Sequence, residues 1–316
     1  MNTHFADRLI EAVKAKGNPI CVGLDPRLNK IPSHIKAAAL SEDKSPMEAA
    51  ADAIVAFNEG IIDAVADIVP AVKPQIAFYE LYGHHGIRAY EETLRYAKSK
   101  GLITIADAKR NDIGSTAAAY AQAFLGEVEM FEGEDEVVMP VFDADSITIT
   151  PYLGYDGIRP FSDEAAKYKK GMFVLVKTSN PSGSDLQDLK LASHQEMPMH
   201  EIVATLVDSW GSDFIGKSGY SFVGAVVGAT YPEEAKKLRH LMPQSIFLVP
   251  GYGAQGGSAE DVRHCFNEDG LGAIVNSSRG IIHAYEKLDG FDELKFAQAS
   301  RKACEIMAED LASVLS

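Results

Sequence analysis

Eight short runs of consecutive apolar residues recur along the chain, separated mostly by longer segments with helical periodicity. Strands that alternate with helices, and that are apolar on successive residues, indicate a parallel sheet covered on both faces. Eight such units predict an α/β fold, a closed (β/α)8 TIM barrel, with an open doubly wound sheet as the alternative. The runs cover residues 19–24, 68–72, 102–106, 146–150, 172–176, 222–227, 246–249 and 273–275.

The length of 316 residues allows one large core, so we expect a single barrel domain over residues 1–316. Two stretches exceed the minimal strand–helix unit. The first, at about 127–145, is strongly acidic, and we interpret it as a solvated surface excursion. The second, at about 179–220, begins with turn-forming residues, and we expect a lid or loop insertion there.

The formal net charge of −15 opposes binding to nucleic acid or to an anionic membrane, but a small phosphorylated substrate needs only local basic groups. The N-terminal residues lack the apolar core of a secretion signal, and no apolar run reaches membrane-spanning length. The three cysteines are far apart and lack metal-ligand spacing. We therefore expect a cytoplasmic protein without a metal or other cofactor.

The strongest chemical signal is the sequence Asp-Ala-Lys-Arg-Asn-Asp-Ile at residues 107–113, directly after an apolar run. Residues two apart on a strand face the same side, so Asp107 and Lys109 would project together into the barrel mouth. Lys73 and Asp25 end two other runs and would complete an alternating acid–base array, in which each charge favours ionisation of its neighbours. A structural ion pair or a solvated strand end is the alternative. Catalysis is favoured because barrel enzymes carry catalytic groups at the C-terminal ends of strands.

Glycine-rich sequence follows the seventh run, at residues 249–257, and a second loop with Arg279 follows the eighth. Glycines let backbone N–H groups approach an anion closely, and arginine supplies a two-pronged charged donor. Barrels hold phosphate at this position. A simple turn is the alternative for either loop alone.

Taken together, these residues resemble the orotidine 5'-phosphate decarboxylase family. Residues 107–113 are similar to its Asp-x-Lys-x-x-Asp-Ile signature, and residues 250–257 resemble its phosphate-gripping loop. The similarity runs from about Ile20 to Ile282. Residues 73–75 and 178–181 look more like the longer bacterial branch of the family than the compact one.

The resemblance implies cofactor-free decarboxylation of orotidine 5'-phosphate to uridine 5'-phosphate and CO2, in de novo pyrimidine biosynthesis, by a homodimer with shared active sites. It assigns the catalytic charge network to Lys73, Asp107, Lys109 as proton donor, and Asp112 from the partner subunit. It assigns substrate binding to Asp25 at the ribose, Thr116 from across the dimer, Ser179 at the pyrimidine, and Gln255 and Arg279 at the phosphate.

Two other functions remain open at this point. A Schiff-base aldolase barrel would use Lys109 or Lys73 as its nucleophile, but it needs a lysine of depressed pKa, which adjacent carboxylates oppose. A non-catalytic barrel that binds a phosphorylated ligand would bind nucleotide without releasing CO2.

Overall fold

A computed structural model describes residues 4–131, 137–230, 232–253 and 257–315, and within them eight parallel strands form a closed barrel. The barrel closes because β1 pairs with β2 on one side and with β12 on the other. The predicted (β/α)8 TIM barrel is confirmed, and the open sheet is wrong. In order around the barrel, the strands are β1 (Ile20–Leu24), β12 (Ala273–Ser277), β11 (Ser245–Val249), β10 (Ser221–Val227), β7 (Gly171–Lys177), β6 (Ser146–Ile149), β3 (Ile103–Arg110) and β2 (Ala71–Pro74).

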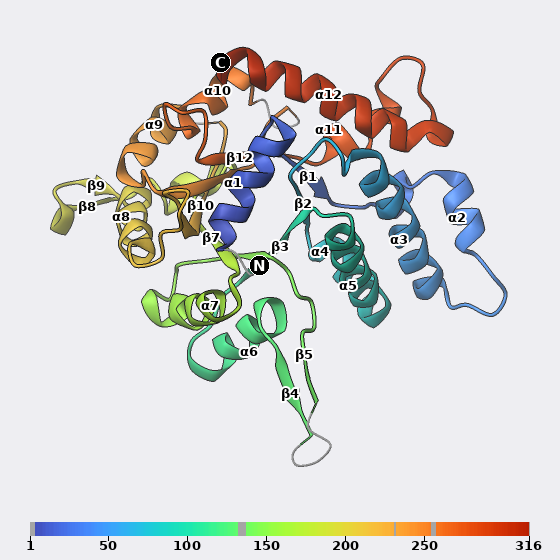
Figure 1. The fold of residues 1–316 in the computed structure, drawn as a ribbon, viewed down its shortest axis with the longest axis horizontal. Helices are drawn as coiled ribbons and strands as arrows, with labels where there is room; N and C mark the ends of the chain where they lie inside the picture. Colours follow the sequence, from blue (N-terminus) through green and yellow to red (C-terminus); the bar gives the residue numbers. More distant parts are fainter. Residues whose placement is uncertain (1–3, 132–136, 231, 254–256, 316) are drawn as a thin grey trace.

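Helices surround the barrel (Figure 1). Among the described residues, no helix is long and apolar enough to cross a membrane. The helices are α1 (Phe5–Lys16), α2 (Ser33–Ala39), α3 (Pro46–Val65), α4 (Ala77–Glu80), α5 (Gly83–Ser99), α6 (Gly114–Leu125), α7 (Tyr155–Tyr168), α8 (Met199–Gly211), α9 (Pro232–Leu241), α10 (Ala259–Val262), α11 (Arg279–Ile282) and α12 (Phe296–Leu315).

Local sequence explains why strands and helices form where they do. Every residue of β1, β10, β11 and β12 is buried, as expected for strands covered by side chains inside the barrel and by helices outside it. The helix α3 begins at Pro46, and the Ser45 hydroxyl accepts a hydrogen bond from the Glu48 amide at 3.2 Å. Gly17 ends α1 with a φ of 68°, a conformation that glycine adopts without strain.

The helix α1 packs against the end of the barrel where the strands begin. The Phe5 ring contacts the Phe173 ring edge to face, with centroids 6.1 Å apart. A Cβ on Gly171, the first residue of β7, would lie 2.1 Å from the Phe5 ring, so only glycine allows this packing. Asp7 accepts hydrogen bonds from the backbone amides of Lys217 and Ser218, at 3.1 and 2.7 Å. The N-terminal end of the barrel is therefore covered, whereas the C-terminal ends of the strands remain available for a site.

The acidic stretch contains a two-stranded antiparallel hairpin, β4 (Val128–Met130) and β5 (Val137–Met139), which projects beyond α6 in Figure 1. The interpretation of the whole stretch as solvated is wrong for Asp145, whereas Asp143 stays partly exposed. Asp145 is buried and pairs with Arg8 at 2.7 Å, and Asp143 pairs with Lys170 at 2.6 Å and with Lys98. The basic partners lie far away in the sequence, so a local charge pattern does not reveal them.

The segment expected as an insertion at 179–220 divides into two parts. Residues 181–198 carry short elements, a 3-10 helix η3 (Pro181–Asp185) and a small hairpin of β8 (Lys190–Leu191) and β9 (Met197–Pro198). The second part contains α8, which packs on β7 and β10 as a regular helix of the barrel. The expected insertion is therefore too long. The buried residues of α8 are His200, Ala204, Val207 and Gly211, which recur at helical spacing.

Candidate active site

Asp107 lies at the centre of a charged cluster at the C-terminal end of the barrel. One of its carboxylate oxygens accepts a hydrogen bond from Lys73 Nζ at 2.7 Å, and the other accepts one from Lys109 Nζ at 2.6 Å. The Thr148 hydroxyl donates to this second oxygen at 2.9 Å. Asp107 and Lys73 are buried, whereas the Lys109 side chain is 45% exposed. Lys109 is thus the ammonium group that a ligand can reach.

The backbone at Lys109 is strained. Its φ is 47°, in the left-handed region that non-glycine residues rarely occupy, and the pairing of β3 with β6 shifts register between Ala106 and Arg110. The Lys109 amide donates to the Thr148 hydroxyl at 3.0 Å, which secures this conformation. The strand continues into the charged motif as far as Arg110, although the motif was predicted to follow the strand. The side chains of Asp107 and Lys109 therefore come together at an irregular strand end, and not through the regular alternation of a β-strand.

The charges of the cluster stabilise one another. Burial alone would raise the pKa of Asp107, but the ammonium groups of Lys73 and Lys109 outweigh burial and hold this pKa well below its usual value. Burial alone would lower the pKa of Lys73, but the carboxylates of Asp107 and Asp25 raise it above its usual value. At neutral pH, Asp107 is therefore a carboxylate and Lys73 is an ammonium.

A cavity of about 350 Å³ opens above this cluster. It is lined by the charged groups, by apolar side chains and by the loop after β7, so it can hold a small polar molecule beside Lys109. The predicted residue Ser179 lies in that loop. The lining residues are Lys73, Asp107, Lys109, Thr148, Leu175, Thr178, Ser179, Asn180, Val226, Leu248 and Pro250.

A second cavity, of about 180 Å³, continues from the first and shares Lys73, Asp107 and Pro250 with it. It brings Asp25 and Arg279 together from the two ends of the chain, and adds Gln75, Gly251, Tyr252, Asn276 and Ser278.

Side chains of the loop after β12 pack closely against the backbone of β1 beside this second cavity. A Cβ on Gly23 would lie 1.8 Å from the Ser278 hydroxyl oxygen, so glycine is required beside this loop. One Asp25 carboxylate oxygen and the side-chain amide oxygen of Asn276 are buried without a hydrogen-bond partner among the described residues. Arg279 is exposed and makes no ion pair with any described residue. These groups can bind a ligand that carries hydroxyl and anionic groups.

Two predicted residues, Asp112 and Thr116, do not line either cavity. Asp112 follows β3, and its carboxylate accepts a hydrogen bond from the Ile113 amide at 2.8 Å. Thr116 is exposed on the first turn of α6. Gln255 lies outside the residues that the structure describes. Within one chain, the structure therefore brings together Asp25, Lys73, Asp107, Lys109, Ser179 and Arg279.

Two polar residues of the site were not predicted from the sequence. Thr148 belongs to β6 and donates to Asp107, and Asn276 ends β12 beside Arg279. Thr148 lies inside a run that was interpreted only as a strand, although it is a polar residue in an otherwise apolar run. Within the described ranges, no group of three or more His, Cys, Asp or Glu residues could hold a metal ion.

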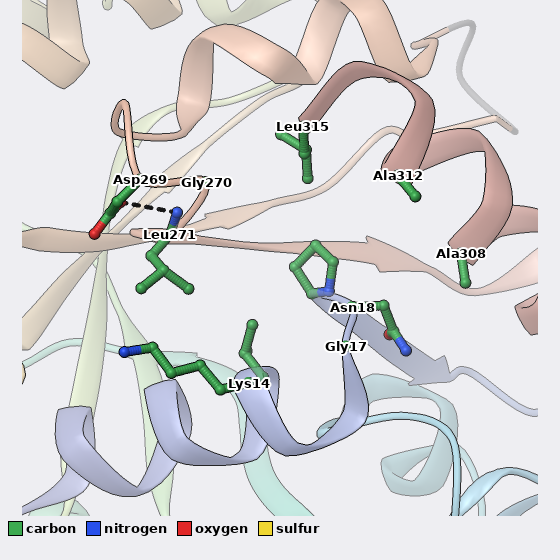
Figure 2. A pocket seen from close by; sticks show the side chains of 11 residues that line it. Lys14, Gly17, Asn18, Asp269, Gly270, Leu271, Ala308, Ala312 and Leu315 are labelled. Atoms are coloured by element: carbon green, nitrogen blue, oxygen red, sulfur yellow. Dashed lines mark hydrogen bonds between the residues drawn. The ribbon is translucent and has the colours of Figure 1, made fainter.

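Another cavity, of about 310 Å³, lies at the opposite end of the barrel (Figure 2). Residues of α1, of the turn before β1, of the loop before β12 and of α12 line it, including Lys14, Asn18, Asp269 and Leu271. The Asp269 carboxylate accepts a hydrogen bond from the Leu271 amide at 3.0 Å. The lining is mostly apolar and has no acid–base array, so this cavity is not the catalytic candidate.

Comparison with known proteins identifies the family. The family model described as "Orotidine 5'-phosphate decarboxylase / HUMPS family" matches residues 18–290. The chain belongs to the orotidine 5'-phosphate decarboxylase family. Among relatives in this family, an orotidine 5'-phosphate decarboxylase of Caldicellulosiruptor bescii is 43% identical over 313 residues, which cover 99% of both chains. Another, from Rhodopirellula baltica, is 44% identical and covers 97% of this chain and 98% of its own.

Solved structures in the orotidine 5'-phosphate decarboxylase family share the barrel. The structure of Leishmania donovani OMP decarboxylase superimposes with a TM-score of 0.72 at 29% identity, covering 99% of each chain. The family membership inferred from the sequence motifs is thus confirmed.

Proposed function

We propose that this chain decarboxylates orotidine 5'-phosphate to uridine 5'-phosphate and CO2, as a step of de novo pyrimidine biosynthesis. One observation carries the proposal: a buried Asp107 carboxylate between Lys73 and Lys109 faces a cavity that continues to Arg279. The relatives with more than 40% identity over nearly their whole length are orotidine 5'-phosphate decarboxylases.

Side-chain charge can perform this chemistry. When the bond between C6 of the pyrimidine and its carboxylate breaks, CO2 leaves and the electron pair stays on C6, where no adjacent π-system delocalises it. The Lys109 ammonium stabilises this carbanion and then transfers a proton to C6. Asp107 holds Lys109 at 2.6 Å, and Lys109 regains its proton from solvent.

The second cavity would bind the ribose and the phosphate. Asp25 has a buried carboxylate oxygen without a partner, which can accept a hydrogen bond from a ribose hydroxyl. Arg279 would pair with the phosphate, and Gln255 would join it from the glycine-rich loop. Because the phosphate is remote from the bond that breaks, its binding energy can orient the pyrimidine beside Lys109.

We further propose a homodimer in which Asp112 and Thr116 complete the partner's site. Exposed apolar side chains support an interface at this rim: Ile113 is 51% exposed beside Asp112, and Tyr152 after β6 is 75% exposed. The two segments lie together, since a Cβ on Gly157 would come 3.0 Å from the Asp112 carbonyl oxygen.

We place the enzyme in the cytoplasm. The three cysteines, Cys21, Cys265 and Cys304, are buried thiols without a disulfide, which fits a reducing compartment.

The two alternative functions predict different behaviour. A Schiff-base mechanism needs a neutral lysine, but neighbouring carboxylates raise the pKa of Lys73 despite its burial. A non-catalytic binding barrel would bind the nucleotide and leave its carboxylate in place.

Incubation of the purified, metal-stripped protein with orotidine 5'-phosphate tests the proposal, with loss of orotate absorbance and release of CO2 as readouts. We expect full turnover after exhaustive chelation, because the proposed proton donor is Lys109. Nucleotide binding without CO2 release would contradict the proposed activity. Activity that is lost on chelation and restored by a metal would contradict the cofactor-free mechanism.

A further inference from the structure

Lys177, the last residue of β7, is buried although it carries a charge. Its ammonium group pairs with the carboxylate of Asp188, which comes from the segment that follows β7. His200, at the start of α8, places Nδ1 3.1 Å from the same carboxylate oxygen. Because a buried ammonium is costly without a counter-charge, this pair draws Asp188 back onto the barrel wall.

Gln187, the residue before Asp188, makes two hydrogen bonds to Thr178, the residue that follows Lys177. Its carboxamide accepts a hydrogen bond from the Thr178 amide at 3.0 Å and donates to the Thr178 hydroxyl at 2.7 Å. The Gln187 carbonyl oxygen accepts from the His200 amide at 2.9 Å and from His200 Nδ1 at 2.7 Å. We call Lys177, Gln187, Asp188 and His200 the lid anchor.

The lid anchor adjoins the active-site cavity directly. Thr178, Ser179 and Asn180 line the cavity above Lys109. On the other side, Gly228 confines the same loop, since a Cβ there would lie 2.9 Å from the Ser179 amide nitrogen. The loop base is therefore held from two directions, by the lid anchor and by the segment after β10.

We propose that Gln187 and Asp188 are positioning residues that hold Thr178, Ser179 and Asn180 in the arrangement that binds the pyrimidine. The inference rests on the proposed decarboxylase function. Neither residue lines the cavity, so each acts through the loop base. If the anchor is weakened, the loop spends less time in the binding arrangement, and apparent affinity falls in proportion to that fraction.

Asp188→Asn tests this role, because it removes the charge that pairs with Lys177 and keeps the side-chain shape. We expect the KM for orotidine 5'-phosphate to rise about tenfold, as when the competent fraction falls to about a tenth, with kcat within about twofold of wild type. The matched control is Asp185→Asn, the same change at an exposed lid residue that makes no ion pair with any described residue. Its KM should stay at the wild-type value.

Hydrogen exchange in the ligand-free protein provides a readout that needs no activity. Amide exchange across residues 178–180 should accelerate in Asp188→Asn, and not in Asp185→Asn. A wild-type protein that fails to decarboxylate would overturn the proposed function, yet this measurement would still test the anchor.

Gln187→Ala is the second variant, because it removes both hydrogen bonds to Thr178 and keeps the ion pair between Lys177 and Asp188. It should also raise KM and accelerate exchange at residues 178–180. If Gln187→Ala folds with wild-type KM and wild-type exchange, the positioning role is wrong, whatever the fate of Asp188→Asn. A fall in kcat with unchanged KM would also overturn it, because the loop would then act in the chemical step.

Discussion

At the scale of single residues, Asp107 organises the site. It is buried, so its charge depends on Lys73 and Lys109, and the buried Lys73 ammonium in turn depends on the carboxylate. Thr148 satisfies one further lone pair and also supports the strained backbone at Lys109. In the proposed mechanism, the Lys109 ammonium is thus held in place before substrate binds, and little reorganisation is needed during the reaction.

Replacing Lys109 with alanine should lower kcat by at least the roughly 10²- to 10⁴-fold expected for loss of a general acid, and by more if carbanion stabilisation also disappears. Binding of uridine 5'-phosphate, measured by calorimetry, should largely persist. Lys169→Ala is the matched control. Lys169 also has a positive φ, of 60°, but it lies at the C-terminal end of α7 and lines neither cavity of the site. A Lys109→Ala enzyme with a tenth of wild-type turnover would remove Lys109 from the mechanism.

Arg279→Ala should weaken transition-state binding of the phosphorylated substrate by about 1.5 to 3 kcal/mol, the scale of a charged hydrogen bond. The measurement is kcat/KM for orotidine 5'-phosphate beside that for orotidine, which lacks the phosphate. The value for orotidine should change little. Equal losses with both substrates would mean that Arg279 supports the fold and does not contact the phosphate.

At the scale of elements, the eight strands could be predicted because burial on both faces leaves a continuous apolar run in the sequence. The boundaries were less predictable. The strand β3 continues through Asp107 and Lys109 because pairing with β6 resumes at Arg110 after the bulge. The helix α8 was included in the expected insertion because that segment begins with turn-forming residues, although the buried residues of α8 recur at helical spacing.

The charged motif predicted where Asp107, Lys109 and Lys73 gather, because strand ends meet at one rim. Partners that approach from other strands were not predictable. Thr148 was hidden in an apolar run, and the pairing of Asp145 with Arg8 spans most of the N-terminal half of the chain. The proposed roles of Asp112 and Thr116 depend on a second subunit and remain predictions.

The connection after α11 should make stability depend on pH. His283 is buried against Phe57, its two ring nitrogens have no hydrogen-bond partner, and burial lowers its pKa to about 4. In the unfolded chain the imidazole has a pKa of about 6.5, so below that pH the unfolded state binds a proton that the folded state does not. The contribution of His283 to the free energy of unfolding is therefore fully present above about pH 7, and it is lost as the pH drops toward 4.

When the pH falls from 7.5 to 5.0, proton uptake by His283 in the unfolded state should lower the free energy of unfolding by about 2 kcal/mol. Urea unfolding of wild type and His283→Phe at both pH values measures the effect. The variant keeps the ring stacked on Phe57 and cannot take up a proton, so its loss over this interval should be smaller by about that amount. Parallel losses in the two proteins would show that His283 does not contribute.

At the scale of the whole molecule, the proposed shared site predicts complementation between two inactive proteins. Lys109→Ala and Asp112→Ala homodimers should each be nearly inactive. A hybrid dimer would contain one site with both residues intact and one site with neither. With random exchange, half of the dimers are hybrids with one working site of two, so about a quarter of wild-type activity should return.

The complementation experiment mixes the two variants under conditions shown to exchange subunits, and then measures CO2 release. Two aliquots of the same variant, exchanged in the same way, provide the control and should stay inactive. If hybrids form and no activity returns, Asp112 acts within its own subunit.

Barrel closure also governs when the site can exist during protein synthesis. The first barrel strand in the sequence, β1, pairs with the last, β12. One edge of β1 therefore stays unpaired until Val275, the partner of Ile20, has been synthesised. Until the ribosome has released nearly the whole chain, β1 and β11 each present an open edge, the kind of surface that nascent chains must shield from one another. Asp25 is synthesised early and Arg279 late, so the second cavity, which both residues line, forms only when β12 closes the barrel.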